Sequence, residues 1–207
     1  MPTQTQITAY GHYLPRYSEL DPEEASRRTG LIFDSGKGRF TFDLLGQIIF
    51  AAWPEFELIP ADHAGCPKTL YNFQTQILFI RYLLEGTYIP PTGGFKAYHE
   101  LPWGELYNAN FRGRCIKRFA YGFGYKPDSF KHAAAALGGK EHDQKDMAYD
   151  FTFIGGITCR LILWTPDDEF PPSAQFLFSD NTQFAFNAED LAVVGDIIIT
   201  ALKECKE

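Results

Sequence analysis

Three consecutive carboxylates form the densest group of chemically active side chains in the sequence. Asp167, Asp168 and Glu169 lie between prolines, shortly after an apolar segment that ends at Trp164. Adjacent carboxylates repel one another, so each needs water, a backbone N–H, a cation or a metal ion as a partner. Clustered carboxylate oxygens suit a hard divalent cation, but the spacing is not the alternating one of a calcium-binding loop. We therefore name no metal ligand, and a hydrogen-bonded cap or a solvated bend is the alternative.

A binding site would arise if basic residues from an earlier segment met this turn. Arg112 or Arg114 could pair with Asp168 or Glu169. If such a cluster lined a cleft, its aromatic walls and few polar groups would suit a small ligand. With the histidine or a carboxylate as a proton-transfer group, the same cluster would be an active site; otherwise it is a structural ion-pair network. The residues that we predict to form the cluster are His99, Glu100, Trp103, Arg112, Trp164, Asp168 and Glu169.

A second polar group precedes the acidic turn in the chain. It consists of His142, Asp143, Asp146 and Asp150. If this segment were helical, His142 and Asp146 would share one face and could bind a metal ion. A polar surface linker is the simpler interpretation.

The four cysteines do not form a recognisable motif. Cys66, Cys115, Cys159 and Cys205 are far apart and contain no CxxC pair, so neither a zinc knuckle nor a redox motif is indicated. Cys115 and Cys159 lie in apolar segments and are predicted to be inert core thiols. The sequence also lacks the patterns of nucleotide-binding loops and of common nucleophile motifs, so it identifies no cofactor.

The overall composition limits the classes of partner. The chain has 207 residues, a formal net charge of −7 and a pI of about 5.2, which argues against binding to a nucleic-acid backbone. The N-terminus opens on polar residues, and no apolar window is long enough to span a bilayer, so we expect neither a signal peptide nor a membrane anchor. Free thiols fit a reducing cytoplasm, which is the compartment we expect.

Three apolar segments near the acidic turn are predicted to be strands. Residues 161–164 form a short continuous apolar run, which is typical of a strand that is covered on both faces and central in its sheet. Residues 175–178 and 183–186 alternate phenylalanine with other side chains, as a half-buried strand does. A tight turn at 179–181 would join the last two. Further strands are expected in a meander between residues 31 and 58.

The helices are indicated by capping residues and by apolar stripes. Asn72 is predicted to cap the main packing helix, which Gly86 closes. Asp21 and Asn187 are predicted to cap two others, and Pro127 to occupy the first turn of a third. The expected helices span residues 7–19, 22–29, 72–85, 105–123, 127–137 and the segment from 187 to the C-terminus.

Together these elements predict an α+β fold for residues 1–207 as a single globular domain. We expect a largely antiparallel sheet covered by the helix after Asn72 and by the C-terminal helix. The length and the 45% hydrophobic content are sufficient for one substantial core.

The order of short motifs resembles that of an uncharacterised bacterial domain family, a domain of unknown function found mainly in anaerobes. The motifs are YLLEG, PTGG, HELPWG, LGG, LILW, DDEFP, LF and AED, and they cover the chain from about Gln74 onward. The resemblance implies kinship with proteins that sometimes carry an iron–sulfur domain or lie near corrinoid-dependent methyl-transfer enzymes. Because this chain has no cysteine cluster, it would be a stand-alone form. The resemblance implies no catalytic residues.

From these observations we predict a cytoplasmic ligand-binding or accessory protein with a cleft near the turn at 167–169. The ligand would be a small molecule, or the partner another protein. One alternative is a hydrolase or transferase that uses Glu100 or Glu169 as a general base. Another is a structural subunit of a protein complex, which would expose its Phe and Tyr residues in one patch.

Overall fold

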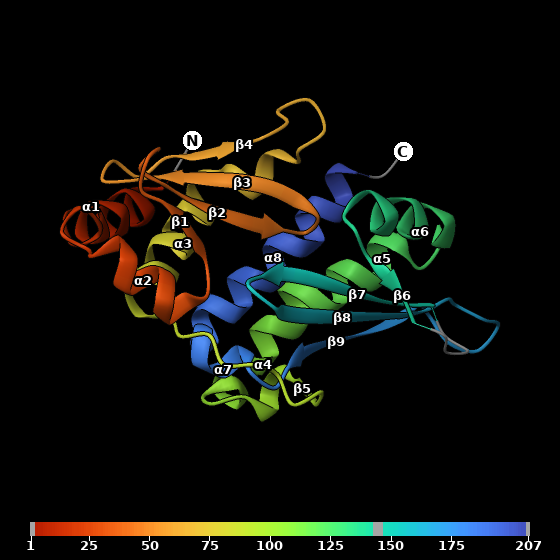
Figure 1. Ribbon diagram of the computed structural model, residues 1–207. Coiled ribbons are helices and arrows are strands. Elements are labelled where there is room, and N and C mark those ends of the chain that lie inside the picture. The colour runs from red at the N-terminus through yellow and green to blue at the C-terminus, as the bar shows by residue number, and fades with distance from the viewer. Residues whose placement is uncertain (1–2, 143–146, 206–207) are drawn as a thin grey trace.

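The computed structural model describes residues 3–142 and 147–205, which form two antiparallel sheets and the helices that cover them (Figure 1). The first sheet has the strand order β1-β2-β3-β4, and the second has the order β5-β9-β8-β7-β6. The predicted α+β class and its antiparallel strands are confirmed. The strands are divided between two sheets, however, where we had expected one.

The first sheet is the meander predicted between residues 31 and 58. It consists of β1 (Ile32–Asp34), β2 (Arg39–Leu44), β3 (Gln47–Ala52) and β4 (Leu58–Pro60). In β2, the alternate residues Phe40, Phe42 and Leu44 are fully buried, while the residues between them are partly or fully exposed. Because successive side chains of a strand point to opposite faces, this alternation determines which face of β2 packs against the core.

The second sheet carries the long strands of the C-terminal half. It consists of β5 (Phe95–Ala97), β6 (Lys140–Glu141), β7 (Met147–Ile154), β8 (Ile157–Trp164) and β9 (Ser173–Ser179). β8 pairs with β7 on one side and β9 on the other, so the predicted central position of residues 161–164 is confirmed. Gly155 and Gly156 have φ of +50° and +83° and close the β7–β8 hairpin, where two left-handed residues match the twist of the strands.

The helices begin near the predicted residues. Asn72 accepts a hydrogen bond from the Thr75 N–H at 3.0 Å, and Asn187 accepts one from the Asp190 N–H at 2.9 Å, as N-caps do. The helices are α1 (Gln4–Ser18), α2 (Pro22–Thr29), α3 (Phe73–Glu85), α4 (Gly104–Phe111), α5 (Arg118–Phe123), α6 (Pro127–Ala136), α7 (Thr182–Ala185) and α8 (Ala188–Glu204), with short 3₁₀ turns η1 (Lys68–Tyr71) and η2 (Tyr98–Glu100). No helix within the described residues is long and apolar enough to cross a bilayer.

The helix predicted over residues 105–123 is present but irregular. Between α4 and α5 the chain forms a π-helical segment, η3 (Arg112–Lys117). π-Helical turns are rare, and they frequently occur beside functional sites. This one packs against α8, with the Cys115 thiol directed at the Ala192 carbonyl oxygen.

The prediction of a strand over residues 183–186 is wrong, because the segment forms the short helix α7. Local polar side chains account for the difference. The Thr182 hydroxyl donates to the Ser179 carbonyl oxygen at 2.6 Å, and the Ser179 hydroxyl donates to the Asn181 side chain at 2.6 Å. Such side-chain bonds to nearby groups favour a helical turn over a continued strand.

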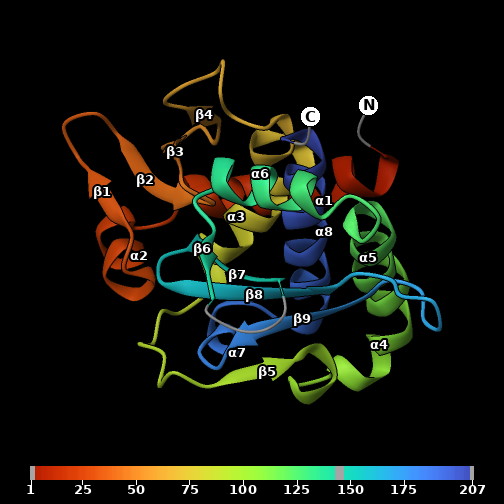
Figure 2. The same ribbon diagram turned by 90° about the vertical axis from the view of Figure 1, so that its right-hand side faces the viewer.

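One hydrophobic core serves both sheets, since their buried residues belong to the same cluster. Phe79 of α3 contacts Phe42 of β2 at 4.8 Å between ring centroids, and it stacks on Phe153 of β7 at 6.4 Å. The backbone N–H of Leu45, in the β2–β3 turn, donates to the Thr152 carbonyl oxygen of β7 at 3.0 Å. Helix α8 runs through the middle of the molecule in both views (Figures 1 and 2), and most of its residues are buried.

Candidate ligand-binding site

The acidic turn is a hydrogen-bonded bend that extends beyond the end of the second sheet (Figure 1). The Asp167 carboxylate accepts hydrogen bonds from the backbone N–H groups of Glu169 and Phe170, at 2.9 and 2.7 Å. Asp168 and Glu169 are exposed. Within the described residues no ion pair joins this turn to Arg112 or Arg114. The structure therefore matches the alternative of a capped, solvated bend.

Arg114 has a different acidic partner from the one that we expected. It pairs with Asp196 of α8 at 2.7 Å, and Arg118 pairs with the same carboxylate. These two cations lower the pKa of Asp196, although burial acts in the opposite direction. The expected pairing with Asp168 or Glu169 is thus replaced by a cluster that fixes η3 and α5 to α8.

The remaining predicted site residues lie in three places. His99 and Arg112 line a small cavity of about 220 Å³, together with Asn108 and Gln175. The Glu100 carboxylate accepts the Ala97 N–H at 2.6 Å and so caps its own turn. Trp164 ends β8, and Trp103 lies beside a different cavity. Of the predicted cluster, the structure brings together only His99 and Arg112.

The second predicted polar group is organised by an arginine. Arg160 donates to both carboxylate oxygens of Asp150, at 2.6 and 2.8 Å, and its guanidinium lies 2.6 Å from His142 Nε2. Asp143 and Asp146 lie outside the described residues. No group of three or more His, Cys, Asp or Glu side chains in the described ranges is arranged to hold a metal ion.

The cysteines are held in the thiol form. Burial raises the pKa of Cys115 to about 12 and that of Cys66 to about 11, and it also raises the pKa of Cys159. Because the thiolate is the reactive form, these side chains are poor nucleophiles at neutral pH.

A buried ion pair that sequence reasoning missed lies between α3 and α8. Arg81 Nη1 is 2.9 Å from Asp190 Oδ1, and the two side chains are only 18% and 9% exposed. Burial raises the pKa of Asp190 to about 6 even though Arg81 acts to lower it. The Arg81 Nε atom is buried and has no hydrogen-bond partner among the described residues. The same holds for Arg39 Nε, Trp53 Nε1 and Arg118 Nε, which do not line a cavity with this ion pair.

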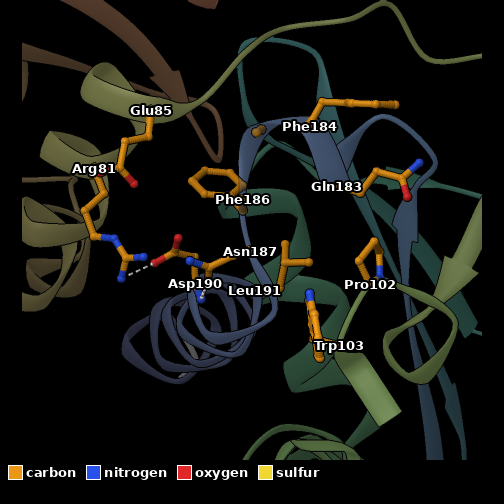
Figure 3. Close-up of a pocket in the computed structure, with 11 residues that line it drawn as sticks. Arg81, Glu85, Pro102, Trp103, Gln183, Phe184, Phe186, Asn187, Asp190 and Leu191 are labelled. Atoms are coloured by element: carbon orange, nitrogen blue, oxygen red, sulfur yellow. Dashed lines mark hydrogen bonds and ion pairs between the residues drawn. The ribbon is translucent and has the colours of Figure 1, made fainter. Parts of the chain in front are cut away.

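Two cavities meet at this ion pair. The first has a volume of about 260 Å³ and is lined by Arg81 and Asp190 on one side and by Trp103 and Gln183 on the other, with Phe186 and Leu191 between them (Figure 3). The second, of about 450 Å³, lies toward α1 and is also lined by Arg81 and Asp190. The pair thus separates two spaces that can admit small molecules.

Trp103 lies at the first cavity in a conformation that costs free energy. Its φ of +64° places it in the left-handed region, which disfavours side chains by about 1 to 2 kcal/mol. The next residue, Gly104, packs so closely that a Cβ atom there would lie 1.8 Å from the Tyr98 carbonyl oxygen. The indole is nevertheless 78% exposed. Backbone strain of this kind tends to occur where a ligand is held.

The local sequence explains how the ion pair is placed. Asn187 caps α8 and so orients the first turn that carries Asp190. A carboxylate in the first turn of a helix is favoured by the helix dipole. Arg81 interrupts the apolar surface of α3. A buried charge on an apolar helix is the signal that could have indicated the site, but its partner is remote in the sequence.

A family model described as a domain of unknown function (DUF3786) matches residues 21–201. The chain belongs to this family. No curated protein and no solved structure matches the chain significantly. The prediction of an uncharacterised domain family is therefore confirmed.

The two cavities differ in whether all of their lining residues fall within the region that the family model matches. Every residue that lines the first cavity falls within 21–201. The second cavity is lined in part by Thr5, Gln6, Ala9 and Tyr13 of α1, which precede the matched region. Of these two cavities, the first is therefore lined wholly by residues of the DUF3786 domain, and the second is not.

Proposed function

We propose that this DUF3786 protein binds a small molecule in the cavity beside Arg81 and Asp190. The observation that carries the proposal is the buried ion pair in the wall of that cavity, since both Arg81 and Asp190 line it. The guanidinium has five N–H donors, so those that Asp190 does not use are available to an acceptor atom of a ligand. Trp103 and Phe184 supply exposed aromatic surface at the same cavity.

A binding role accounts for the cavity better than a nucleophilic enzyme does. The described residues that line it include no Ser, Thr, Cys, His, Lys or Tyr, and its two carboxylates, Glu85 and Asp190, are each paired with an arginine. An enzyme based on Glu100 or Glu169 remains a weaker proposal, because Glu100 caps its own turn and Glu169 is exposed. A structural subunit is also weaker, because the exposed aromatic residues lie on several separate elements, including α4, α5 and α7.

The cellular context is part of the same proposal. We place the protein in the bacterial cytoplasm, where its four free thiols would stay reduced. A link to the corrinoid or iron–sulfur metabolism of anaerobes is consistent with the family resemblance. The cavity of about 260 Å³ is smaller than typical drug-sized pockets of about 300 to 1,000 Å³, so the ligand would be a small metabolite and not a corrinoid macrocycle.

The test is a thermal-shift screen of a metabolite library that includes corrinoids and divalent metals. The wild type is compared with the double variant Arg81→Met/Asp190→Leu, because replacing a buried ion pair by apolar residues often preserves the fold. The matched control, Glu23→Leu/Arg27→Met, removes two exposed charges from α2. We expect to find compounds that raise the melting temperature of the wild type and of the control but not that of the Arg81→Met/Asp190→Leu variant. Compounds that stabilise all three proteins equally, or the absence of any binder, would contradict the proposal.

A further inference from the structure

The charges around the first cavity do not balance. Glu85 and Asp190 supply two carboxylates, and Arg81 is the one cation among its described lining residues. Glu85 has an outside partner, Arg16, at 3.2 Å, but both side chains of that pair are about half exposed. Exposed pairs contribute little and exchange readily with solvent. When Asp190 is ionised, the lining residues themselves therefore carry a net charge of −1, and the counter-charge of Glu85, Arg16, lies outside the lining.

The walls of the cavity are suited to a positive charge as well. Trp103, Phe184 and Phe186 contribute rings from three different positions around it (Figure 3). The faces of aromatic rings attract cations, and tryptophan does so most strongly. Phe186 is held against Tyr82 at 5.2 Å and Phe153 at 6.1 Å, so this ring is fixed before any ligand arrives. Rings and carboxylates around a small cavity are the chemistry that recognises organic ammonium ions.

We infer that the ligand of this cavity is an organic cation, an alkylated ammonium ion that lies against Trp103 and Phe186 and faces Asp190 and Glu85. This inference rests on the proposed binding function and specifies its ligand class. An acceptor oxygen on the same molecule, such as a hydroxyl close to the ammonium group, would accept a hydrogen bond from a guanidinium N–H of Arg81 that Asp190 does not use. An anion would instead have to approach two carboxylates with a single arginine to offset them.

Protonation of Asp190 as the pH falls provides an independent test of the charge of the ligand. The charged groups that face it are Arg81 and Glu85 from α3 and Glu189 from its own helix. Its pKa of about 6 means that it is mostly ionised at pH 7.5 and mostly protonated at pH 5. A cation stabilises the ionised form, so its affinity should rise with pH across this range. An anion would show the opposite dependence.

The experiment is isothermal titration with three probes of similar shape: choline, its neutral analogue 3,3-dimethylbutan-1-ol, and the anion 3,3-dimethylbutanoate. At pH 7.5 we expect choline to bind at least about ten-fold more tightly than the neutral analogue. We expect Trp103→Leu to weaken choline about ten-fold and Glu85→Gln about two- to five-fold. Asp190→Asn should remove the dependence on pH.

Controls of the same chemistry lie away from the cavity. Trp164→Leu and Glu24→Gln replace a tryptophan and an exposed glutamate that do not line it, and they should leave choline affinity unchanged. If Asp190→Asn does not fold, Glu85→Gln, whose side chain is half exposed, still tests the charge.

The possible results distinguish a failure of this inference about the ligand class from a failure of the proposed binding function. Binding of the anion or the neutral analogue, but not of choline, overturns the ligand class while the cavity remains a binding site. Choline binding that is insensitive to Trp103 and Glu85 overturns the assignment to this cavity. If none of the three probes binds, the ligand class is wrong, and the metabolite screen then decides separately whether the cavity binds anything.

Discussion

Asp190 is subject to two opposing electrostatic effects. Burial disfavours its ionised form, whereas Arg81 at 2.9 Å favours it, and burial has the larger effect on its pKa. The folded protein therefore holds the Asp190 proton to a higher pH than the unfolded chain does. This makes the ion pair a source of pH-dependent stability as well as part of the wall of the proposed binding cavity.

Replacing Asp190 by Asn should change how stability depends on pH. The folded-state pKa of Asp190 is about 6, against an ordinary value of 3.8, so its protonated form stabilises the fold at low pH. That contribution is fully present below pH 3.8 and is lost as the pH rises through about 6. Relative to Asp190→Asn, the wild type should lose about 1 to 3 kcal/mol of unfolding free energy between pH 4 and 7.5.

Urea unfolding of both proteins at several pH values measures this difference. Carboxylates with lowered pKa values, such as Asp196 and Asp180, are the same in both proteins and cancel in the comparison. A difference between wild type and variant that does not change with pH would show that Asp190 titrates normally in the folded protein.

We expect Trp103 to lower the free energy of unfolding, although it contributes to the proposed ligand site. Because its φ is +64° and its side chain is largely exposed, Trp103→Gly relieves backbone strain and loses little burial. We expect the unfolding free energy to rise by about 0.5 kcal/mol, after allowing for the greater entropy of glycine in the unfolded chain. Trp103→Leu keeps the strain and serves as the control. A stability loss above about 1 kcal/mol in the glycine variant would show that the indole is structural.

The sequence predicted single residues well where their role is local. The caps at Asp21, Asn72 and Asn187 were recognisable because a cap and its N–H partners are only two or three residues apart. Arg81 and Asp190 were not recognisable as partners, because nothing local to either segment specifies how α3 and α8 pack. The candidate site was therefore placed at the acidic turn, where Asp167 is hydrogen-bonded within the turn and Asp168 and Glu169 are exposed to solvent.

Close packing of α8 against the π-helical segment η3 depends on a glycine. A Cβ atom on Gly195 would lie 3.0 Å from both Cys115 Sγ and a ring carbon of Phe111. The neighbouring Asp196 receives Arg114 and Arg118 from the same region. The irregular helical segment thus packs on α8 so closely that any larger residue at position 195 would displace the Cys115 or Phe111 side chain. Since this geometry depends on two packed helices, helical periodicity in residues 105–123 could not reveal it.

Two glycine-to-alanine substitutions should have opposite effects on stability. Gly195→Ala forces buried atoms apart and should lower the unfolding free energy by about 1 to 3 kcal/mol. Gly11→Ala, in α1, meets open space and should raise it by about 0.5 to 1 kcal/mol, because alanine favours the helix. Denaturant unfolding of both variants makes the comparison. If Gly195→Ala is as stable as wild type, the α8–η3 contact is looser than the structure indicates.

The strands illustrate what local patterns can and cannot specify. The continuous apolar run at 161–164 correctly indicated a central strand, although its periodicity alone did not exclude a buried helical turn. The alternation at 183–186 was equally regular, yet hydrogen bonds among Ser179, Asn181 and Thr182 turn that segment into α7. Buried polar side chains just before an alternating segment are the feature that distinguishes the two cases.

The two sheets share one hydrophobic core. A shared core is what the prediction of a single domain requires. Phe79 touches rings from both sheets, and the Leu45 N–H of the first sheet donates to Thr152 of the second. Composition and length predicted one core, but they could not show that its strands divide into two sheets. That division depends on which strands pair, and the pairing involves residues that are remote in sequence.

Both sheets should unfold in the same transition. Trp53 follows the last residue of β3, and Trp164 is the last residue of β8, so single-tryptophan variants that keep one or the other report on each sheet. We expect the two fluorescence transitions in urea to have the same midpoint. Phe79→Ala, which removes the ring between the sheets, should lower both midpoints together and cost about 3 to 5 kcal/mol. Separate midpoints would instead indicate two independently stable units.

The most direct test of the ligand site follows the three tryptophan indole N–H signals of ¹⁵N-labelled protein during titration with a ligand found in the screen. Trp103 lies at the proposed cavity, Trp164 precedes the acidic turn, and Trp53 directly follows β3 of the first sheet. Trp103→Leu assigns the decisive signal. The expected result is a saturable shift of the Trp103 signal with the other two unchanged. A shift of the Trp164 signal with Trp103 unchanged would contradict the assignment and move the site back to the acidic turn.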